Sequence, residues 1–217
     1  MNSDAAPRPH SVHRDNPLPT LSAAVLAGGS STRMGVAKGL LEVDGRPLIS
    51  RVIDVLSSIS DDVLCVTCQP DLYRFESPRL RFTPDEDADP RGPLSGIVGG
   101  LSAARHELCI IVAVDMPFLN AEVLRSLARR ASEATDVVVP VIEEDRPEGM
   151  HAVYRTSCLA PARAALAAGK RKLTKLFDEL EVVRIPAGEL SHIDGYRESF
   201  INVNTPEELE AIRGGGL

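Results

Sequence analysis

Apolar residues along this chain alternate between short continuous runs and longer segments with helical spacing. The short runs have the length of β-strands and lie at 23–27, 40–43, 63–67, 80–83, 108–114, 136–142, 150–154 and 182–185. Helical patterns cover 48–59, 93–104, 157–168, 173–180 and 205–212, and a further helix is expected after Asn120. The run at 108–114 is apolar at every position, which is typical of a central strand buried on both faces. This alternation predicts an α/β fold with a mainly parallel central sheet and helices on both faces.

Short motifs mark where some of these elements begin and end. Asp44 and Gly45 form a two-residue turn signal between the run at 40–43 and the helix that follows. Asn120 has the side chain of a helix N-cap. Thr205 and Glu208 have the spacing of a capping box, so the last helix is predicted to begin there.

Composition and length indicate one globular domain. The chain has 217 residues, of which 43% are hydrophobic, enough for a core. Residues 1–20 are polar and rich in proline, so we expect a disordered lead-in there and a single domain over 21–213. No apolar run approaches the roughly 20 residues that span a bilayer, and the N-terminus lacks the apolar core of a signal peptide. We therefore expect no membrane partner.

The net charge of −7 argues against a general nucleic-acid-binding protein, which needs a broad basic surface. A small phosphate ligand requires only a few local cations, so a nucleotide remains compatible with this charge.

The four cysteines show no zinc-binding pattern. Cys65 and Cys68 form one C-x-x-C pair, but Cys109 and Cys158 stand alone, and a structural zinc site needs a second pair. Cys65 and Cys109 lie in apolar runs and are expected to be buried, with a redox pair of Cys65 and Cys68 as the alternative. This usage fits a reducing, cytoplasmic compartment.

The first strand runs into a glycine-rich segment with the chemistry of a phosphate-binding loop. Gly28 and Gly29 follow the strand, small hydroxyl residues come next, and Arg33 and Lys38 supply positive charge. The backbone N–H groups of residues 27–30 are predicted to face phosphates. Neither G-x-x-x-x-G-K-[ST] nor G-x-G-x-x-G is present. The alternatives are a plain turn after the strand and solvated loop cations.

Asp115 follows the fully apolar run at 108–114. A carboxylate there is costly to bury unless it meets a cation or a hydrogen-bond donor. A magnesium ligand would satisfy it, because hard cations prefer oxygen ligands, and the alternative is an aspartate that caps a loop.

Five stretches occur in an order that resembles a known enzyme family. They are LAGGSSTRMGVAKGLLEVDGRPLI from Leu26, Asp85 leading into GPLSGIVGGL, VAVDMPFL, GKRKLTKLF and FINVNTPEEL. Together they resemble the nucleotidyltransferases with a Rossmann-like fold and, among these, the MobA family of molybdenum cofactor guanylyltransferases. The resemblance runs from about Ala23 to the C-terminus. The LAGG sequence with Gly29 resembles the guanylyl-transferring branch, since related cytidylyltransferases tend to have alanine at this position. Ala37 stands where many members of the family carry aspartate.

The resemblance implies the site residues. Arg33, Lys38 and Asp115 would be catalytic, and Asp115 would also hold the metal ion. The residues implied to bind the nucleotide are Leu26, Ala27, Gly28, Gly29, Lys38, Asp85 and Asp115. Those implied to contact the acceptor are Lys170, Lys172, Asn202 and Asn204, and the alternatives are a solvated helix end for the lysines and backbone-capping amides for the asparagines.

The implied reaction moves GMP from GTP to the terminal phosphate of molybdopterin and releases pyrophosphate. Magnesium is the expected cofactor, with manganese as the alternative ion, and molybdoenzymes or cofactor-carrying proteins would receive the product. Alternative functions are a molybdopterin cytidylyltransferase, a sugar-1-phosphate nucleotidyltransferase, and a nucleotide-binding regulatory protein without enzyme activity.

Overall fold

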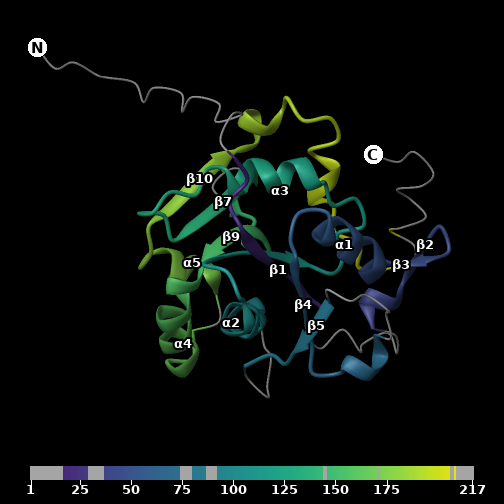
Figure 1. The fold of residues 1–217 in the computed structure, drawn as a ribbon, viewed down its shortest axis with the longest axis horizontal. Coiled ribbons are helices and arrows are strands. Elements are labelled where there is room, and N and C mark those ends of the chain that lie inside the picture. Colours follow the sequence, from purple (N-terminus) through teal and green to yellow (C-terminus); the bar gives the residue numbers. More distant parts are fainter. Residues whose placement is uncertain are drawn as a thin grey trace, which may run out of the picture.

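The computed structural model describes residues 17–28, 37–73, 80–86, 92–143, 146–170, 172–205 and 208. One eight-stranded sheet forms the centre, with the strand order β10-β7-β9-β6-β1-β4-β5, while β8 pairs with β7 outside this path. A separate two-stranded sheet joins β2 to β3. Figure 1 shows the main sheet crossing the molecule between two layers of helices.

The bounds of the strands and helices follow the chain order. The strands of the main sheet are β1 (Leu21–Leu26), β4 (Asp62–Val66), β5 (Leu80–Thr83), β6 (Leu108–Ala113), β7 (Val137–Glu143), β8 (Arg146–Pro147), β9 (His151–Arg155) and β10 (Val182–Pro186). The small sheet contains β2 (Glu42–Val43) and β3 (Arg46–Pro47). The α-helices are α1 (Leu48–Ser57), α2 (Pro93–Ala103), α3 (Ala121–Ala128), α4 (Leu159–Ala167) and α5 (Leu173–Phe177).

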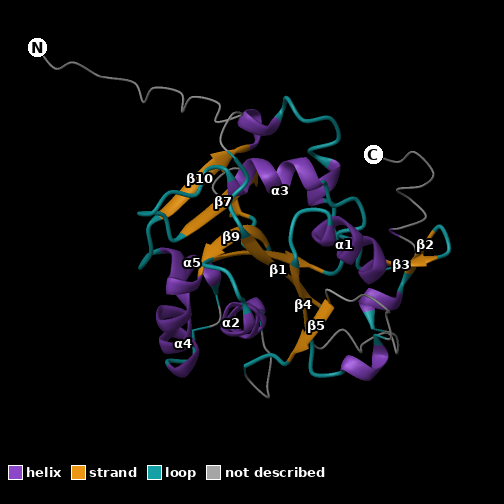
Figure 2. Cartoon of the chain, viewed as in Figure 1, coloured by secondary structure: helices purple, strands orange, loops and turns teal. Residues whose placement is uncertain are grey.

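The apolar periodicity explains the two helical layers. Helices α1 and α3 pack on one face of the sheet, and their apolar stripes join the cluster that includes Val25, Ile49 and Leu124. Helices α2, α4 and α5 cover the other face (Figure 2). Helix α2 packs closely on the chain that follows β5, since a Cβ on Gly99 would lie only 2.4 Å from the backbone oxygen of Pro84. Gly99 therefore allows close packing of this helix against the backbone after β5.

The sheet is mostly parallel, as predicted. β1 pairs in parallel with β4 and β6, and β10 pairs in parallel with β7. β9 runs antiparallel to both of its neighbours, β6 and β7. The carboxyl ends of β1 and β6 therefore meet at the same edge as the start of β9.

Most predicted element boundaries agree with the structure to within two or three residues, and the exceptions are local. The run at 40–43 divides into a 3₁₀ turn over Lys38–Leu40 and the short strand β2. The predicted turn is confirmed, since Asp44 and Gly45 have φ angles of 52° and 72°. The Asn120 cap is also confirmed, because its Oδ1 accepts a hydrogen bond from the Glu122 N–H at 2.8 Å. The sequence pattern did not predict β3 or β8.

At the C-terminus, one predicted capping contact is present. The Glu208 N–H donates to the Thr205 hydroxyl at 3.1 Å, but the remainder of the expected helix lies outside the described residues. The lead-in predicted over 1–20 also lies outside them, except for 17–20.

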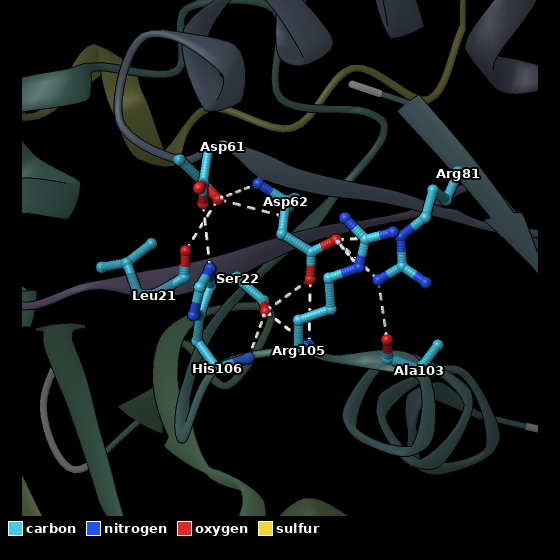
Figure 3. A network of polar contacts seen from close by, with 9 residues as sticks. Leu21, Ser22, Asp61, Asp62, Arg81, Ala103, Arg105 and His106 are labelled. Atoms are coloured by element: carbon cyan, nitrogen blue, oxygen red, sulfur yellow. Dashed lines mark hydrogen bonds and ion pairs between the residues drawn. The ribbon is translucent and has the colours of Figure 1, made fainter. Parts of the chain in front are cut away.

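The amino-terminal edge of the sheet contains a buried polar network around Asp62, the first residue of β4 (Figure 3). Its Oδ1 accepts hydrogen bonds from Arg81 Nε and Nη2 at 2.9 and 2.6 Å. Its Oδ2 accepts from the Ser22 hydroxyl at 2.7 Å and from the Arg105 N–H at 3.0 Å. Burial alone would raise the pKa of Asp62, but these hydrogen bonds and the Arg81 charge hold it below its usual value. The network joins β1, β4 and β5 at one point.

The cysteines are reduced and mostly buried. All four thiols are free, and among them Cys65 and Cys109 are fully buried, as predicted. Burial raises the pKa of Cys65 to about 12, so its thiol is unreactive as a nucleophile. Among the described residues, no helix is long and apolar enough to cross a membrane.

Candidate active site

Three residues far apart in the sequence meet at the carboxyl edge of the sheet. Lys38 Nζ lies 3.1 Å from Asp115 Oδ2 and donates to Asn204 Oδ1 at 2.6 Å. Lys38 and Asp115 are separated by 77 residues, and Lys38 and Asn204 by 166. Two residues predicted to bind nucleotide and one predicted to bind the acceptor therefore share one cluster.

The backbone at the end of β6 fixes the position of Asp115. The Val114 N–H donates to the backbone oxygen of Leu26 at 3.2 Å, which ties this turn to the end of β1. The Val203 N–H donates to the backbone oxygen of Asp115 at 2.8 Å. The second contact brings the asparagine-containing segment beside the aspartate.

The carboxylate of Asp115 is only half satisfied. Its side chain is 17% exposed, and Oδ2 contacts Lys38. Oδ1 is buried and has no hydrogen-bond partner among the described residues. A buried oxygen without a partner is costly, whereas a bound cation or a donor would satisfy it.

This donor set suits magnesium. Mg²⁺ is bound by one or two carboxylates together with substrate phosphates more often than by an all-protein cage. Within the described ranges, no group of three or more His, Cys, Asp or Glu side chains could hold a metal. A single free carboxylate oxygen beside a lysine therefore fits a metal that enters with a phosphate ligand.

Asp85 lies beside the end of β1 at the same edge of the sheet. A Cβ on Gly28, just after β1, would lie 2.2 Å from Asp85 Oδ2, and one on Gly96 of α2 would lie 3.2 Å from Oδ1. A side chain at position 28 would therefore push the Asp85 carboxyl group aside. Burial raises the pKa of Asp85, and the Cys68 thiol, 3.8 Å from Oδ2, opposes that shift. The Asp85 carboxyl group is thus half-buried and close to the predicted loop.

The start of the glycine-rich loop differs from the prediction at one amide. The Ala27 N–H donates to the Val66 backbone oxygen at 2.9 Å, so it extends the sheet and is unavailable to a phosphate. The prediction that this N–H faces the ligand is wrong, because the pairing of β1 with β4 continues one residue beyond the strand. The Ala27 oxygen accepts from the buried Tyr73 hydroxyl at 3.3 Å. Gly29 and Arg33 lie outside the described residues.

Within the part of the chain that the structure describes, the other predicted acceptor residues form no hydrogen bond or ion pair with this cluster. Lys170 Nζ pairs with Glu179 at 2.8 Å. Lys172 is exposed and precedes α5, while Asn202 is exposed beside Val203. Asn204 accepts from Lys38 instead of capping the backbone with its side chain. Only Asn204 of the four therefore joins Lys38 and Asp115.

Sequence reasoning assigned no site role to three buried residues around this edge. Tyr73 supports Ala27, and His151 and Ser199 lie under the segment that contains Asn204. No motif or spacing signals these roles, because each depends on contacts between distant parts of the chain.

Comparison with known proteins decides the family. A family model described as the MobA-like NTP transferase domain matches residues 23–184. The chain belongs to the MobA-like NTP transferase family. The resemblance predicted from the sequence is thereby confirmed.

Relatives of this MobA-like protein match over nearly their full length. A protein from Desulfosudis oleivorans named molybdenum cofactor guanylyltransferase is 35% identical over 208 residues, covering 92% of this chain and 100% of the relative. A probable molybdenum cofactor guanylyltransferase from Natronomonas pharaonis is 38% identical over 196 residues, covering 87% and 95%.

A solved structure confirms the predicted fold class of this MobA-like protein. Molybdopterin-guanine dinucleotide biosynthesis protein A from Archaeoglobus fulgidus superposes with a TM-score of 0.74 at 27% identity. The match covers 90% of this chain and 100% of that one.

Proposed function

We propose that this protein is a molybdenum cofactor guanylyltransferase. It transfers GMP from GTP to the terminal phosphate of molybdopterin and releases pyrophosphate. Family membership and the similarity to proteins with this name over nearly the whole chain support the activity. The observation that carries the site assignment is the buried, unpartnered Oδ1 of Asp115 beside Lys38.

The reaction needs positioning and charge neutralisation more than proton transfer. An oxygen of the acceptor phosphate forms a bond to the α-phosphorus of GTP, and the bond from that phosphorus to the β-phosphate bridging oxygen breaks. The attacking oxygen is already anionic, so no general base is required. The barrier arises from bringing two anions together and from the charge that develops on pyrophosphate.

Lys38 and Asp115 have complementary roles in this reaction. Asp115 would hold Mg²⁺ through its free carboxylate oxygen, and the metal ion supplies charge neutralisation to the phosphates when bound. Lys38 then turns from Asp115 toward the triphosphate, because the ammonium group gains a more highly charged partner there. Arg33 is proposed to add a second positive charge. Manganese is the alternative ion.

Asp85 is proposed to contact the base or ribose of the nucleotide. A carboxylate accepts hydrogen bonds from N–H and O–H groups but repels phosphates. Gly28 and Gly96 leave it accessible at the edge between β1 and α2. The nucleotide would therefore lie with its phosphates toward Lys38 and its nucleoside toward Asp85.

The acceptor is proposed to approach from the side of Asn202 and Asn204, with Lys170 and Lys172 as further contacts. The Lys170–Glu179 pair is half exposed, so exchanging Glu179 for a phosphate costs little. A cytoplasmic location is proposed from the four free thiols, and molybdoenzymes or cofactor-carrying proteins are proposed recipients.

Pyrophosphate release measured with each nucleotide and acceptor tests this function. The purified protein with Mg²⁺ should release pyrophosphate with GTP and molybdopterin. Faster release with CTP would favour the cytidylyltransferase, and release with a sugar 1-phosphate would favour the sugar-nucleotide enzyme. Binding of GTP without turnover in the presence of loaded cofactor would favour the regulatory protein.

A further inference from the structure

A fully buried histidine lies beneath the active-site edge with an unpartnered ring nitrogen. His151 is 0% exposed, and its Nδ1 has no hydrogen-bond partner among the described residues. It is the first residue of β9 and pairs with Val112 of β6, three positions before Asp115. An apolar side chain would fill this position without leaving a polar atom unsatisfied. The histidine therefore needs a reason beyond core packing.

The side chain of His151 contacts the chain segment that reaches the active site. Its Nε2 lies 3.5 Å from the Ser199 hydroxyl oxygen, and its ring packs on Phe200 with centroids 4.4 Å apart. The Ser199 hydroxyl also accepts from the Asn120 N–H at 2.9 Å. Ser199 and Phe200 are the first two residues of the segment 199–204.

The same segment ends on the catalytic cluster. Val203 donates to the backbone oxygen of Asp115, and Asn204 accepts from Lys38. Its first backbone bonds are local, from Phe200 to Arg197 and from Ile201 to Glu198. The segment 199–204 is thus held at its start by His151 and Asn120 and at its end by Asp115 and Lys38.

We propose that His151 is a positioning residue for nucleotidyl transfer. Its ring fixes the start of the segment 199–204, so that Val203 and Asn204 arrive at Asp115 and Lys38 in the correct register. The inference rests on the proposed function, because it assigns His151 a role in the reaction that Lys38 and Asp115 perform. His151 itself touches no reacting group.

Two matched substitutions separate positioning from packing. His151→Leu fills the space with an apolar side chain and removes the unsatisfied nitrogen, so the fold should persist. Val153→Ala is the control, because Val153 lies two residues along β9, on the same face, and is 1% exposed against 0% for His151. It should lower stability without loosening the segment.

Hydrogen exchange of the Val203 amide reads the segment directly, without any substrate. In His151→Leu we expect this amide to exchange about tenfold faster than in the wild type, since its bond to Asp115 opens more often. The kcat should fall about tenfold, with the KM for GTP nearly unchanged because Asp85 is untouched. His151→Phe, which keeps a ring against Phe200 but lacks the nitrogen that faces the Ser199 hydroxyl, should restore both properties only in part.

Wild-type exchange and wild-type kcat in His151→Leu would overturn the proposal, as would equal effects of His151→Leu and Val153→Ala. If the wild-type protein transfers no GMP, the proposed function fails. The exchange measurement would still show whether His151 fixes the segment, so the two failures are distinguishable.

Discussion

Two aspartates at opposite edges of the sheet show how differently a buried carboxylate can be used. Asp62 at the amino-terminal edge is 1% exposed. Its Oδ1 accepts hydrogen bonds from Arg81, and its Oδ2 accepts from the Ser22 hydroxyl and the Arg105 N–H. Asp115 at the carboxyl edge has one oxygen on Lys38 and the other without a partner. A carboxylate with all its hydrogen-bond partners indicates a structural role, whereas the unpartnered oxygen of Asp115 indicates that a ligand binds there.

The largest expected effect is on turnover at Asp115. Asp115→Asn removes the charge that would hold the metal, so we expect kcat to fall about a hundredfold to a thousandfold. The melting temperature should stay close to that of the wild type, since the backbone contact with Val203 remains. Pyrophosphate release and thermal unfolding measure the two quantities. If the variant instead fails to fold, Asp115 has a structural role like that of Asp62.

The reverse result is expected at the other edge. Asp62→Asn leaves Arg81 and the Arg105 N–H without their full set of acceptors, so the free energy of unfolding should fall by about 3 kcal/mol. Turnover per folded molecule should not change, because the network lies at the far end of the strands. Urea unfolding, together with activity normalised to folded protein, checks both statements. A drop in normalised kcat without a change in stability would reverse the comparison.

Lys38 tests the active-site edge from its cationic side. Lys38→Met keeps the length of the side chain without its charge, and GTP affinity should weaken about tenfold or more. Isothermal titration with GTP and Mg²⁺ measures this loss. Lys170→Met is the control, since that lysine pairs with Glu179 on the surface. Unchanged affinity in Lys38→Met would remove this residue from the nucleotide site.

Acid should reveal the smallest difference. The pKa of Asp62 is lowered in the folded state, so its contribution to stability is complete above pH 3.8 and is lost as pH falls through the folded pKa. The wild type should therefore lose stability more steeply below pH 3.8 than Asp62→Asn. Burial lowers the pKa of His151 to about 3, so this residue reduces stability as the pH falls from 6.5 to 3. That loss is the same in the wild type and in Asp62→Asn. Parallel curves below pH 3.8 would mean that Asp62 is not ionised in this network.

The sequence predicted the elements better than the contacts. Local apolar spacing and the Asn120 cap were enough to locate β1, α1 and α3. Strand direction was not predictable in the same way, because the run at 150–154 looks alike whether it is parallel or antiparallel. The antiparallel direction of β9 follows from its partners β6 and β7.

The same limit applies to the site. The chemistry of Lys38 and Asp115 was visible in the sequence, but the role of Asn204 came from the family resemblance, and no local pattern brings residues 77 and 166 positions apart into contact. Asp62 gave no signal, because an aspartate pair at 61–62 is usual in a loop. The hydrogen bond from the Ala27 N–H to β4 could not be predicted either, because it depends on the register between β1 and β4.

The central claim is that Asp115 and Lys38 form one site for a metal-bound triphosphate. A crystal structure with Mn²⁺ and a GTP analogue that cannot be cleaved between the α- and β-phosphates tests it directly, because manganese is located by its anomalous signal. The account predicts a peak within coordination distance of Asp115 Oδ1, with Lys38 turned onto the phosphates. An ion held elsewhere, with the Lys38–Asp115 pair intact, would contradict it.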